Sequence, residues 1–164
     1  MRTVIGVMGG AIASEETSAN AHELGRLIAE NGWVLLNGGR NAGVMAESAR
    51  GASEAGGLVI GILPGRDRTG AAPHLDVAIP TGLNDARNAV NVLASHVIVV
   101  LPGGAGTISE AALALKNNTP VVALGFPLGV PFSPYYDRGA LIDATSPAEA
   151  IEIIRTLLDE DSVA

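Results

Sequence analysis

Residues 97–110 read VIVVLPGGAGTISE, which predicts a buried strand, a glycine-rich turn and the first turn of a helix. Residues 97–101 are continuously apolar and rich in β-branched side chains, as expected for a strand covered on both faces. Pro102 cannot donate to a strand ladder, so the strand should end there. A glycine turn that leads into a helix N-terminus is a preformed anion site. We therefore expect a phosphate-like group near residues 103–107, with the Glu110 carboxylate one helical turn away.

Two interpretations of this segment remain open. The glycines could serve only the geometry of a tight turn, and Thr107 and Glu110 have the spacing of a capping box. Alternatively, Glu110 is a carboxylate beside a bound anion. It could then orient water or stabilise positive charge, as in the cleavage of a glycosidic bond.

Strand and helix patterns alternate along the whole chain. Strands are expected at 3–7, 33–36, 58–63, 77–79, 97–101 and 121–124. Helices are expected at 15–31, 44–55, 84–95, 107–117 and 147–158, with 125–140 as a loop. This alternation predicts an α/β fold, a single Rossmann-like domain over residues 1–164 with a mainly parallel sheet and helices on both faces. Ligands of such sheets bind beyond the carboxyl ends of the strands. The glycine turns at 9–10, 38–43 and 102–106 should share that edge.

The helix expected at 84–95 has an unusual polar face. Polar residues recur at i, i+3, i+4 and i+7, namely Asn84, Arg87, Asn88 and Asn91. Asn is a poor helix former, and a solvated face would normally carry Lys and Glu. This face is either a hydrogen-bonding surface for a polar ligand or a buried polar contact between helices. Core contacts are expected from Val90, Val92 and Leu93.

Composition limits the classes of partner. The 164 residues carry a net charge of −7, which argues against a general nucleic-acid or membrane-surface binder. The chain has no cysteine, so disulfides and thiolate chemistry are excluded. No apolar run approaches the length of a membrane span, and the expected location is the cytoplasm. A hydrophobic share of 48% and an apolar helix at 107–117 predict a homodimer or homotetramer.

Other motifs are informative by their absence. Neither a Walker-type phosphate loop nor a dinucleotide fingerprint is present. The histidines have no metal-ligand spacing, and no metal site is expected. Lys116 is the single lysine and should point away from Glu110, which argues against a pyridoxal-phosphate enzyme. Arg66 and Arg68 lie in a long loop at 64–76, where they could close over a phosphate or simply be solvated.

Three segments together resemble the LOG-like superfamily, often labelled lysine decarboxylase-like. They are GGRNAGVM at 38–45, Arg87, and PGGAGTISE at 102–110. The superfamily includes the cytokinin-activating Lonely Guy phosphoribohydrolases. The segments ESARGASEAGGLVIGILPG and IPTGLNDARN look closer to its branch of molybdenum cofactor carrier proteins and uncharacterised bacterial proteins.

The resemblance implies a catalytic pair, Arg87 and Glu110, and a phosphate-binding turn. With the shared sheet edge and the polar face, the candidate ligand-binding residues are Gly9, Gly38, Gly39, Arg40, Asn84, Asn88, Gly103, Gly104, Gly106 and Thr107. Hydrolases of the superfamily usually have lysine where this chain has Asn88, and glycine where it has Arg40.

Three functions follow as hypotheses. The first is hydrolysis of the N-glycosidic bond of a nucleoside 5′-monophosphate, with no cofactor required. The second is a non-catalytic carrier of a phosphorylated pterin such as molybdenum cofactor. The third is an interaction module with a vestigial site. The expected partner is a small phosphorylated ligand, either a nucleoside monophosphate or a molybdopterin-type molecule.

Overall fold

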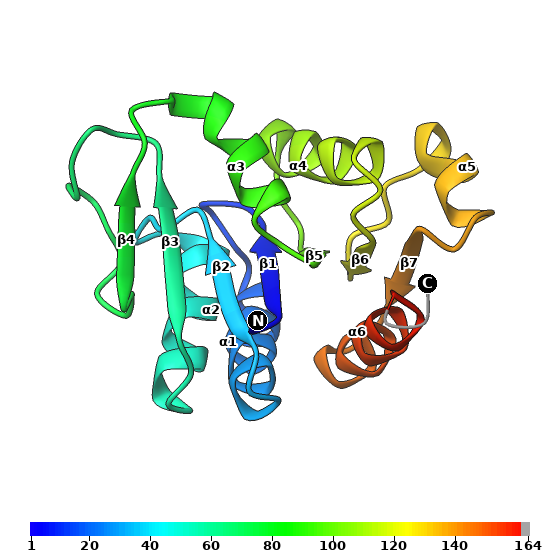
Figure 1. The fold of residues 1–164 in the computed structure, drawn as a ribbon, viewed down its shortest axis with the longest axis horizontal. Helices are drawn as coiled ribbons and strands as arrows, with labels where there is room; N and C mark the ends of the chain where they lie inside the picture. Colours follow the sequence, from blue (N-terminus) through cyan, green and yellow to red (C-terminus); the bar gives the residue numbers. More distant parts are fainter. Residues whose placement is uncertain (162–164) are drawn as a thin grey trace.

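A wholly parallel sheet of seven strands organises the part of the chain described by the computed structural model, residues 1–161 (Figure 1). The strands are β1 (Val4–Met8), β2 (Val34–Asn37), β3 (Val59–Leu63), β4 (Val77–Pro80), β5 (Val97–Val100), β6 (Val121–Leu124) and β7 (Leu141–Ala144). Their order across the sheet is β4-β3-β2-β1-β5-β6-β7. All carboxyl ends therefore lie at one edge, and the direction of winding reverses between β1 and β5.

Helices cover both faces of the sheet (Figure 1). The helical elements are α1 (Glu15–Glu30), α2 (Gly43–Glu54), η1 (Asn84–Arg87), α3 (Asn88–Leu93), α4 (Ala105–Lys116), η2 (Val130–Phe132), α5 (Ser133–Tyr136) and α6 (Pro147–Asp161). Helices α1, α2 and α6 share one hydrophobic core with the sheet, and α3 and α4 share the other. The predicted α/β architecture with a parallel sheet is confirmed.

Three local expectations are wrong. The helix expected at 84–95 is divided into the 3-10 turn η1, which begins at Asn84 with a left-handed φ of 50°, and the short helix α3. Leu93, expected in the core, is 69% exposed. The segment 125–140, expected as a loop, contains η2 and α5.

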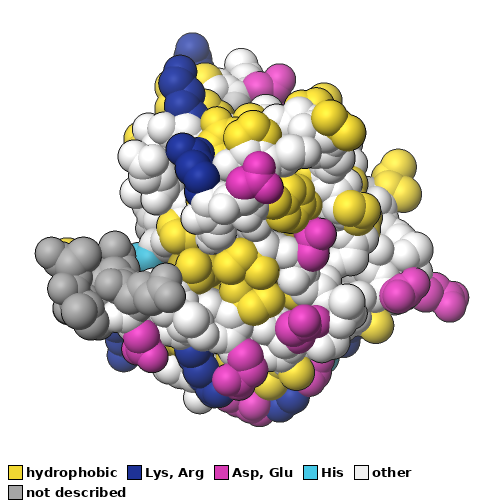
Figure 2. All heavy atoms as spheres, turned by 90° about the vertical axis from the view of Figure 1, so that its right-hand side faces the viewer, with side chains coloured by type: hydrophobic (Ala, Val, Ile, Leu, Met, Phe, Trp, Pro, Cys, Tyr) yellow, Lys and Arg dark blue, Asp and Glu magenta, His cyan; other side chains and the backbone are white. Residues whose placement is uncertain are grey.

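Strand β7 was not expected, although it forms one edge of the sheet. Figure 2 shows apolar side chains gathered on this side of the molecule, with acidic side chains around them. A groove of about 250 Å³ lies here, lined by Ile142 of β7 and by Ile153 and Leu157 of α6, among others.

Helices α1 and α2 approach each other so closely that glycine is required at their contact. A Cβ on Gly25 would overlap the carbonyl oxygen of Ser48, and one on Gly51 would overlap that of His22. The two backbones are therefore in direct contact, which fixes α2 and the turn before it relative to the sheet.

We expect Gly51→Ala to lower the free energy of unfolding by about 1–3 kcal/mol, because the new methyl group must push the helices apart. Gly106→Ala is the matched control, since Gly106 is also helical but has no atom within 4 Å of the place that its new methyl group would take. That variant should be neutral or more stable by up to about 1 kcal/mol. Urea denaturation measures both, and equal stabilities would contradict the expected helix contact.

Candidate functional site

The three glycine turns meet at the carboxyl edge of the sheet, as expected. The Gly10 N–H donates to the Pro102 carbonyl over 3.0 Å, which joins the turns after β1 and β5. The Gly10 carbonyl accepts from the Val44 N–H, also over 3.0 Å, which joins the turn after β2. These bonds place the turns around the point where the winding of the sheet reverses, the usual ligand site of such folds.

The N-terminus of α4 is open to solvent. Helix α4 begins at Ala105, two residues before the expected start, and Gly104 is its N-cap without a side-chain cap. The first backbone bond runs from the Ile108 N–H to the Gly104 carbonyl, so the N–H groups of residues 105–107 have no acceptor within the helix. A Cβ on Gly104 or Gly106 would have no neighbour within 4 Å. The turn therefore presents free amides and the positive end of the helix dipole to an anion.

Thr107 lies beneath this turn, not on its surface. Its side chain is buried, with 4% of the residue exposed. A Cβ on Gly103 would overlap the Thr107 hydroxyl, so the two residues are in close contact. Thr107 therefore supports the turn, and direct phosphate binding by its hydroxyl stays a prediction.

Arg87 lies against the turn that follows β2. Its Nη1 and Nη2 atoms are 2.6 Å and 2.8 Å from the position of a Cβ on Gly38, so a larger residue there would displace the guanidinium from its present place. Nη1 is 3.7 Å from Glu110 Oε1. The Nε atom is buried and has no hydrogen-bond partner. Burial lowers the pKa of Arg87, and the Glu110 carboxylate acts in the opposite direction.

Glu110 points inward to α3 instead of capping its own helix. It is 6% exposed, and its Oε1 atom accepts a 2.7 Å hydrogen bond from Asn91 Nδ2. Burial raises the pKa of Glu110, while the hydrogen bond from Asn91 and the charge of Arg87 act to lower it. Because α4 begins before Thr107, the capping-box interpretation is wrong.

Asn91 is a site residue that the sequence analysis placed on the polar face but did not select. It is fully buried, and its Nδ2 atom also lies 3.7 Å from Met8 Sδ. Its Oδ1 atom is buried without a partner. Asn91 joins β1, α3 and α4 at one point, which is the buried polar contact between helices that was one of the two interpretations of the polar face.

A second buried asparagine, Asn37 at the end of β2, was missed altogether. Its Oδ1 atom accepts from the Gly39 N–H over 2.8 Å, and its Nδ2 atom donates to the Met45 carbonyl over 2.9 Å. These bonds fix the glycine turn under Arg87. An Asn directly before two glycines was the available signal.

The remaining candidates surround this centre. Asn88 donates to Ser109 Oγ over 2.9 Å, which ties α3 to α4. Gly9 contacts the Val44 side chain. Arg40 is exposed and pairs with Ala71 through an isolated β-bridge. Asn84 is exposed at the start of η1. The structure thus brings Arg87, Glu110 and the two glycine turns together, whereas Arg40 and Asn84 lie at the rim.

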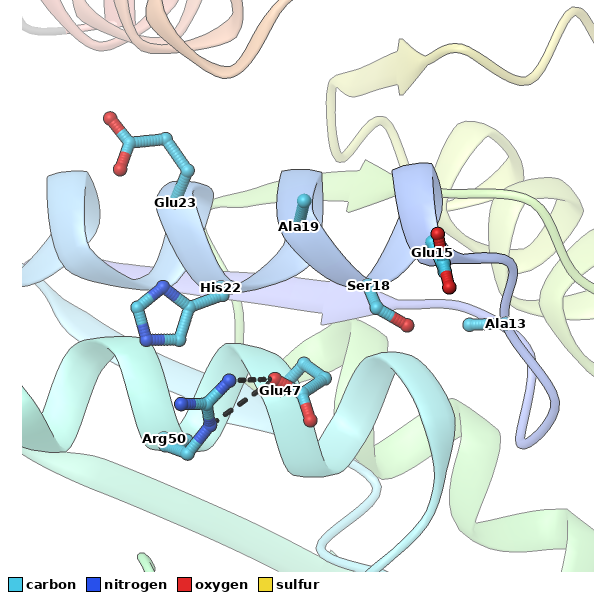
Figure 3. A pocket seen from close by; sticks show the side chains of 8 residues that line it. All are labelled: Ala13, Glu15, Ser18, Ala19, His22, Glu23, Glu47 and Arg50. Atoms are coloured by element: carbon cyan, nitrogen blue, oxygen red, sulfur yellow. Dashed lines mark hydrogen bonds and ion pairs between the residues drawn. The ribbon is translucent and has the colours of Figure 1, made fainter.

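A separate groove of about 550 Å³ runs between α1 and α2 (Figure 3). It is lined by three glutamates, Glu15, Glu23 and Glu47, and its Arg50 is bound to Glu47. An anionic ligand would meet net negative charge there. Within residues 1–161, no cluster of His, Asp and Glu is arranged to hold a metal ion, and no helix could span a membrane.

We expect the stability of the protein relative to its Glu110→Gln variant to fall as pH rises from about 4.5. The folded pKa of Glu110 lies above that of the unfolded chain, so the folded state binds the proton more tightly in this window. The loss is at most about 1.4 kcal/mol per pH unit. Glu149→Gln is the control. Because hydrogen bonds from Thr145 lower the pKa of Glu149, the stability of wild type relative to this variant should rise with pH. Urea denaturation from pH 3 to pH 8 tests this, with the effect of Glu149 expected below about pH 4.5. A constant difference between wild type and Glu110→Gln would contradict the prediction.

Comparison with known proteins identifies the family. The molybdenum cofactor binding protein of Rippkaea orientalis superposes with a TM-score of 0.90 at 44% identity, over 96% of this chain and 98% of that one. The Moco carrier protein of Chlamydomonas reinhardtii gives 0.88 and 44%, over 98% and 99%. The cytokinin riboside 5′-monophosphate phosphoribohydrolase of Mycobacterium tuberculosis is 35% identical over 92 residues, 55% of this chain and 49% of that protein.

The model of the SLOG cluster4 family matches residues 2–151. The predicted resemblance to the LOG-like proteins, including the Moco carrier-like branch, is confirmed. The chain belongs to the SLOG cluster4 family.

Proposed function

We propose that this protein is a carrier that binds a phosphorylated small molecule of the molybdopterin type without cleaving it. The observation that carries the proposal is the open amide turn at Gly104, which begins the helix whose Glu110 lies 3.7 Å from the half-buried Arg87. A phosphate at the turn would receive hydrogen bonds from the free amides of α4. The two superposed proteins described as molybdenum cofactor binder and carrier support the same ligand class.

The geometry of Glu110 favours binding over hydrolysis. Its Oε1 atom is already held by Asn91, and the residue is 6% exposed. A carboxyl group that is buried and already hydrogen-bonded has little access to a water molecule or to a substrate. Asn88, where hydrolases of the superfamily usually have lysine, is bonded to Ser109 and adds no charge.

The ligand would be cargo, held by its phosphate and its polar ring. The chain has no cysteine, so its own side chains offer no thiolate to a metal at the far end of the ligand. The groups that meet the ligand are amides and a guanidinium, which form reversible hydrogen bonds. Such contacts suit a protein that must release what it binds.

We expect Gly104→Val to weaken ligand retention about tenfold or more, because its side chain would cover the free amides. No atom lies within 4 Å of its methyl position, so the fold should be unaffected. Molybdenum cofactor released anaerobically from a denatured molybdoenzyme is mixed with each protein, and retained molybdenum and pterin are measured after gel filtration. Absence of retention by wild type, or equal retention by both, would overturn the carrier proposal.

Hydrolysis of nucleoside 5′-monophosphates is the second candidate, supported by the relation to the Mycobacterium tuberculosis enzyme. The same proteins are incubated with the common monophosphates and assayed for free base. Release by wild type above the level of a Glu110→Ala variant would favour the enzyme; equal levels would exclude it.

We also propose that the chain forms a homodimer or homotetramer through the outer face of α3 and α4. Leu93 is 69% exposed and Ile108 is 43% exposed, and Lys116 is the only exposed charged residue of these two helices. A second copy of the chain would remove this apolar surface from water.

The double variant Leu93→Glu with Ile108→Glu should shift the protein to monomer, because two carboxylates would be buried at the contact. Light scattering after gel filtration measures the mass. Val130→Glu is the control, since Val130 is 83% exposed in a different element. A wild-type monomer, or a double variant of unchanged mass, would contradict this interface.

A further inference from the structure

The arginines of this protein divide into paired and unpaired groups. Three arginines on the outer helices, Arg26, Arg50 and Arg155, form ion pairs with neighbouring glutamates. Within residues 1–161, an ion pair and a side-chain hydrogen bond are both absent from Arg2, Arg40, Arg66, Arg68 and Arg138, of which Arg138 lies over the Tyr135 ring. Arg40, Arg66 and Arg68 follow β2 and β3 at the carboxyl edge of the sheet, whereas Arg2 precedes β1. The chain has 17 acidic and 10 basic residues, so acids are not scarce.

Asp67, the acid nearest to Arg66 in sequence, forms no ion pair with Arg40 or Arg66. Asp67 follows Arg66 directly, but its Oδ1 atom accepts a 2.9 Å hydrogen bond from the Thr69 N–H. Its carboxylate therefore completes a local turn. The Arg66 side chain beside it makes no direct contact with this carboxylate and stays open to a ligand.

The loop that carries Arg66 is held at both ends. Near its start, the Gly82 N–H donates to the Gly65 carbonyl over 2.8 Å, which joins the loop to the turn after β4. Near its end, the Ala72 N–H donates to the Gly39 carbonyl over 2.8 Å, which joins it to the glycine turn after β2. The loop is thus fixed to the same edge as the candidate site.

Gly82 makes room for the Arg66 side chain. Its φ is +66°, and a Cβ on it would lie 3.2 Å from Arg66 Cγ. Arg40 belongs to the turn after β2 whose Gly38 contacts the Arg87 guanidinium, and the charge of Arg40 acts to lower the pKa of Arg87. Two unpaired cations therefore extend the site from Arg87 outward, away from α4.

We propose that the ligand is an elongated dianion whose second anionic group binds Arg40 and Arg66. This inference rests on the proposed function, which places the first group at the N-terminus of α4. Strand β2 is two positions from β5 in the sheet, and β3 is three. Neighbouring strands are about 4.8 Å apart, so the two anionic groups are roughly 10–14 Å from each other. A ligand with a phosphate at one end and a second phosphate or oxyanion at the other has this form.

Inorganic phosphate is the first probe, because separate phosphate ions can bind at the N-terminus of α4 and at Arg40 and Arg66. Thermal unfolding is followed in phosphate and in chloride of equal ionic strength, since an anion that binds the folded state raises the melting temperature. The Arg40→Gln, Arg66→Gln double variant and the Gly104→Val variant should each lose about half of the increase seen with wild type, and their combination should lose all of it. Arg26→Gln with Arg50→Gln removes the same charge from α1 and α2 and should respond as wild type.

The outcomes separate the two proposals. A wild-type response in Arg40→Gln, Arg66→Gln together with a reduced response in Gly104→Val would overturn the second anion position and leave the proposed function standing. A wild-type response in Gly104→Val would contradict the first position. Absence of any phosphate effect on wild type would overturn both.

A series of α,ω-alkanediol bisphosphates then measures the separation. Binding of two linked groups is strongest when the linker matches the distance between their positions. Wild type should bind an intermediate member, with phosphates about 10–14 Å apart, about tenfold more tightly than the shortest member. The affinity maximum at intermediate linker length should be absent from the Arg40→Gln, Arg66→Gln double variant. A wild-type affinity that is independent of linker length would overturn the proposal.

Discussion

The contact between the Arg87 guanidinium and Gly38 sets the requirements for the rest of the site. A largely buried cation costs several kcal/mol unless it is paired. Glu110 at 3.7 Å supplies charge but no direct hydrogen bond, and the Arg87 Nε atom has no partner. Glu110 is itself buried and depends on Asn91. The cluster of Arg87, Glu110 and Asn91 therefore lacks part of its hydrogen-bond partners. An anionic ligand beside Arg87 would supply counter-charge and hydrogen-bond acceptors that the protein alone does not provide.

This requirement explains why so much backbone converges at one edge. The bond from Gly10 to Pro102 and the bond from Val44 to Gly10 hold the three glycine turns together. The close contact of α1 and α2 fixes the turn after β2 from the other side. A rigid frame of this kind can hold a costly charge, whereas mobile loops would let the guanidinium move into water.

The sequence predicts the strands and the glycine turns better than the buried side-chain contacts at the site. Strands rich in Val, Ile and Leu were found within one or two residues, but β7 contains Asp143 and has only four residues, so it has no clear apolar pattern. Helix α4 starts at Ala105 and Gly106, which carry no capping signal, so Thr107 was mistaken for its beginning. The partnership of Asn91 with Glu110 links α3 to α4, and Met8 of β1 also contacts Asn91. Contacts between residues distant in sequence are not visible in local periodicity.

The distribution of charge gives a physical reason for reversible binding. A net charge of −7 repels anions in general, while unpaired arginines at one edge attract them locally. A ligand held at two separated points gains affinity because the second contact forms at high effective concentration. Release requires both contacts to open, but each is a reversible contact between charged or polar groups, so no covalent bond has to be broken. Glu110 belongs to the same cluster, since its Oε1 atom lies 3.7 Å from Arg87 Nη1 and accepts a hydrogen bond from Asn91. The carboxyl group that hydrolysis would require as a base is thus already engaged in holding Arg87 and α3 in place.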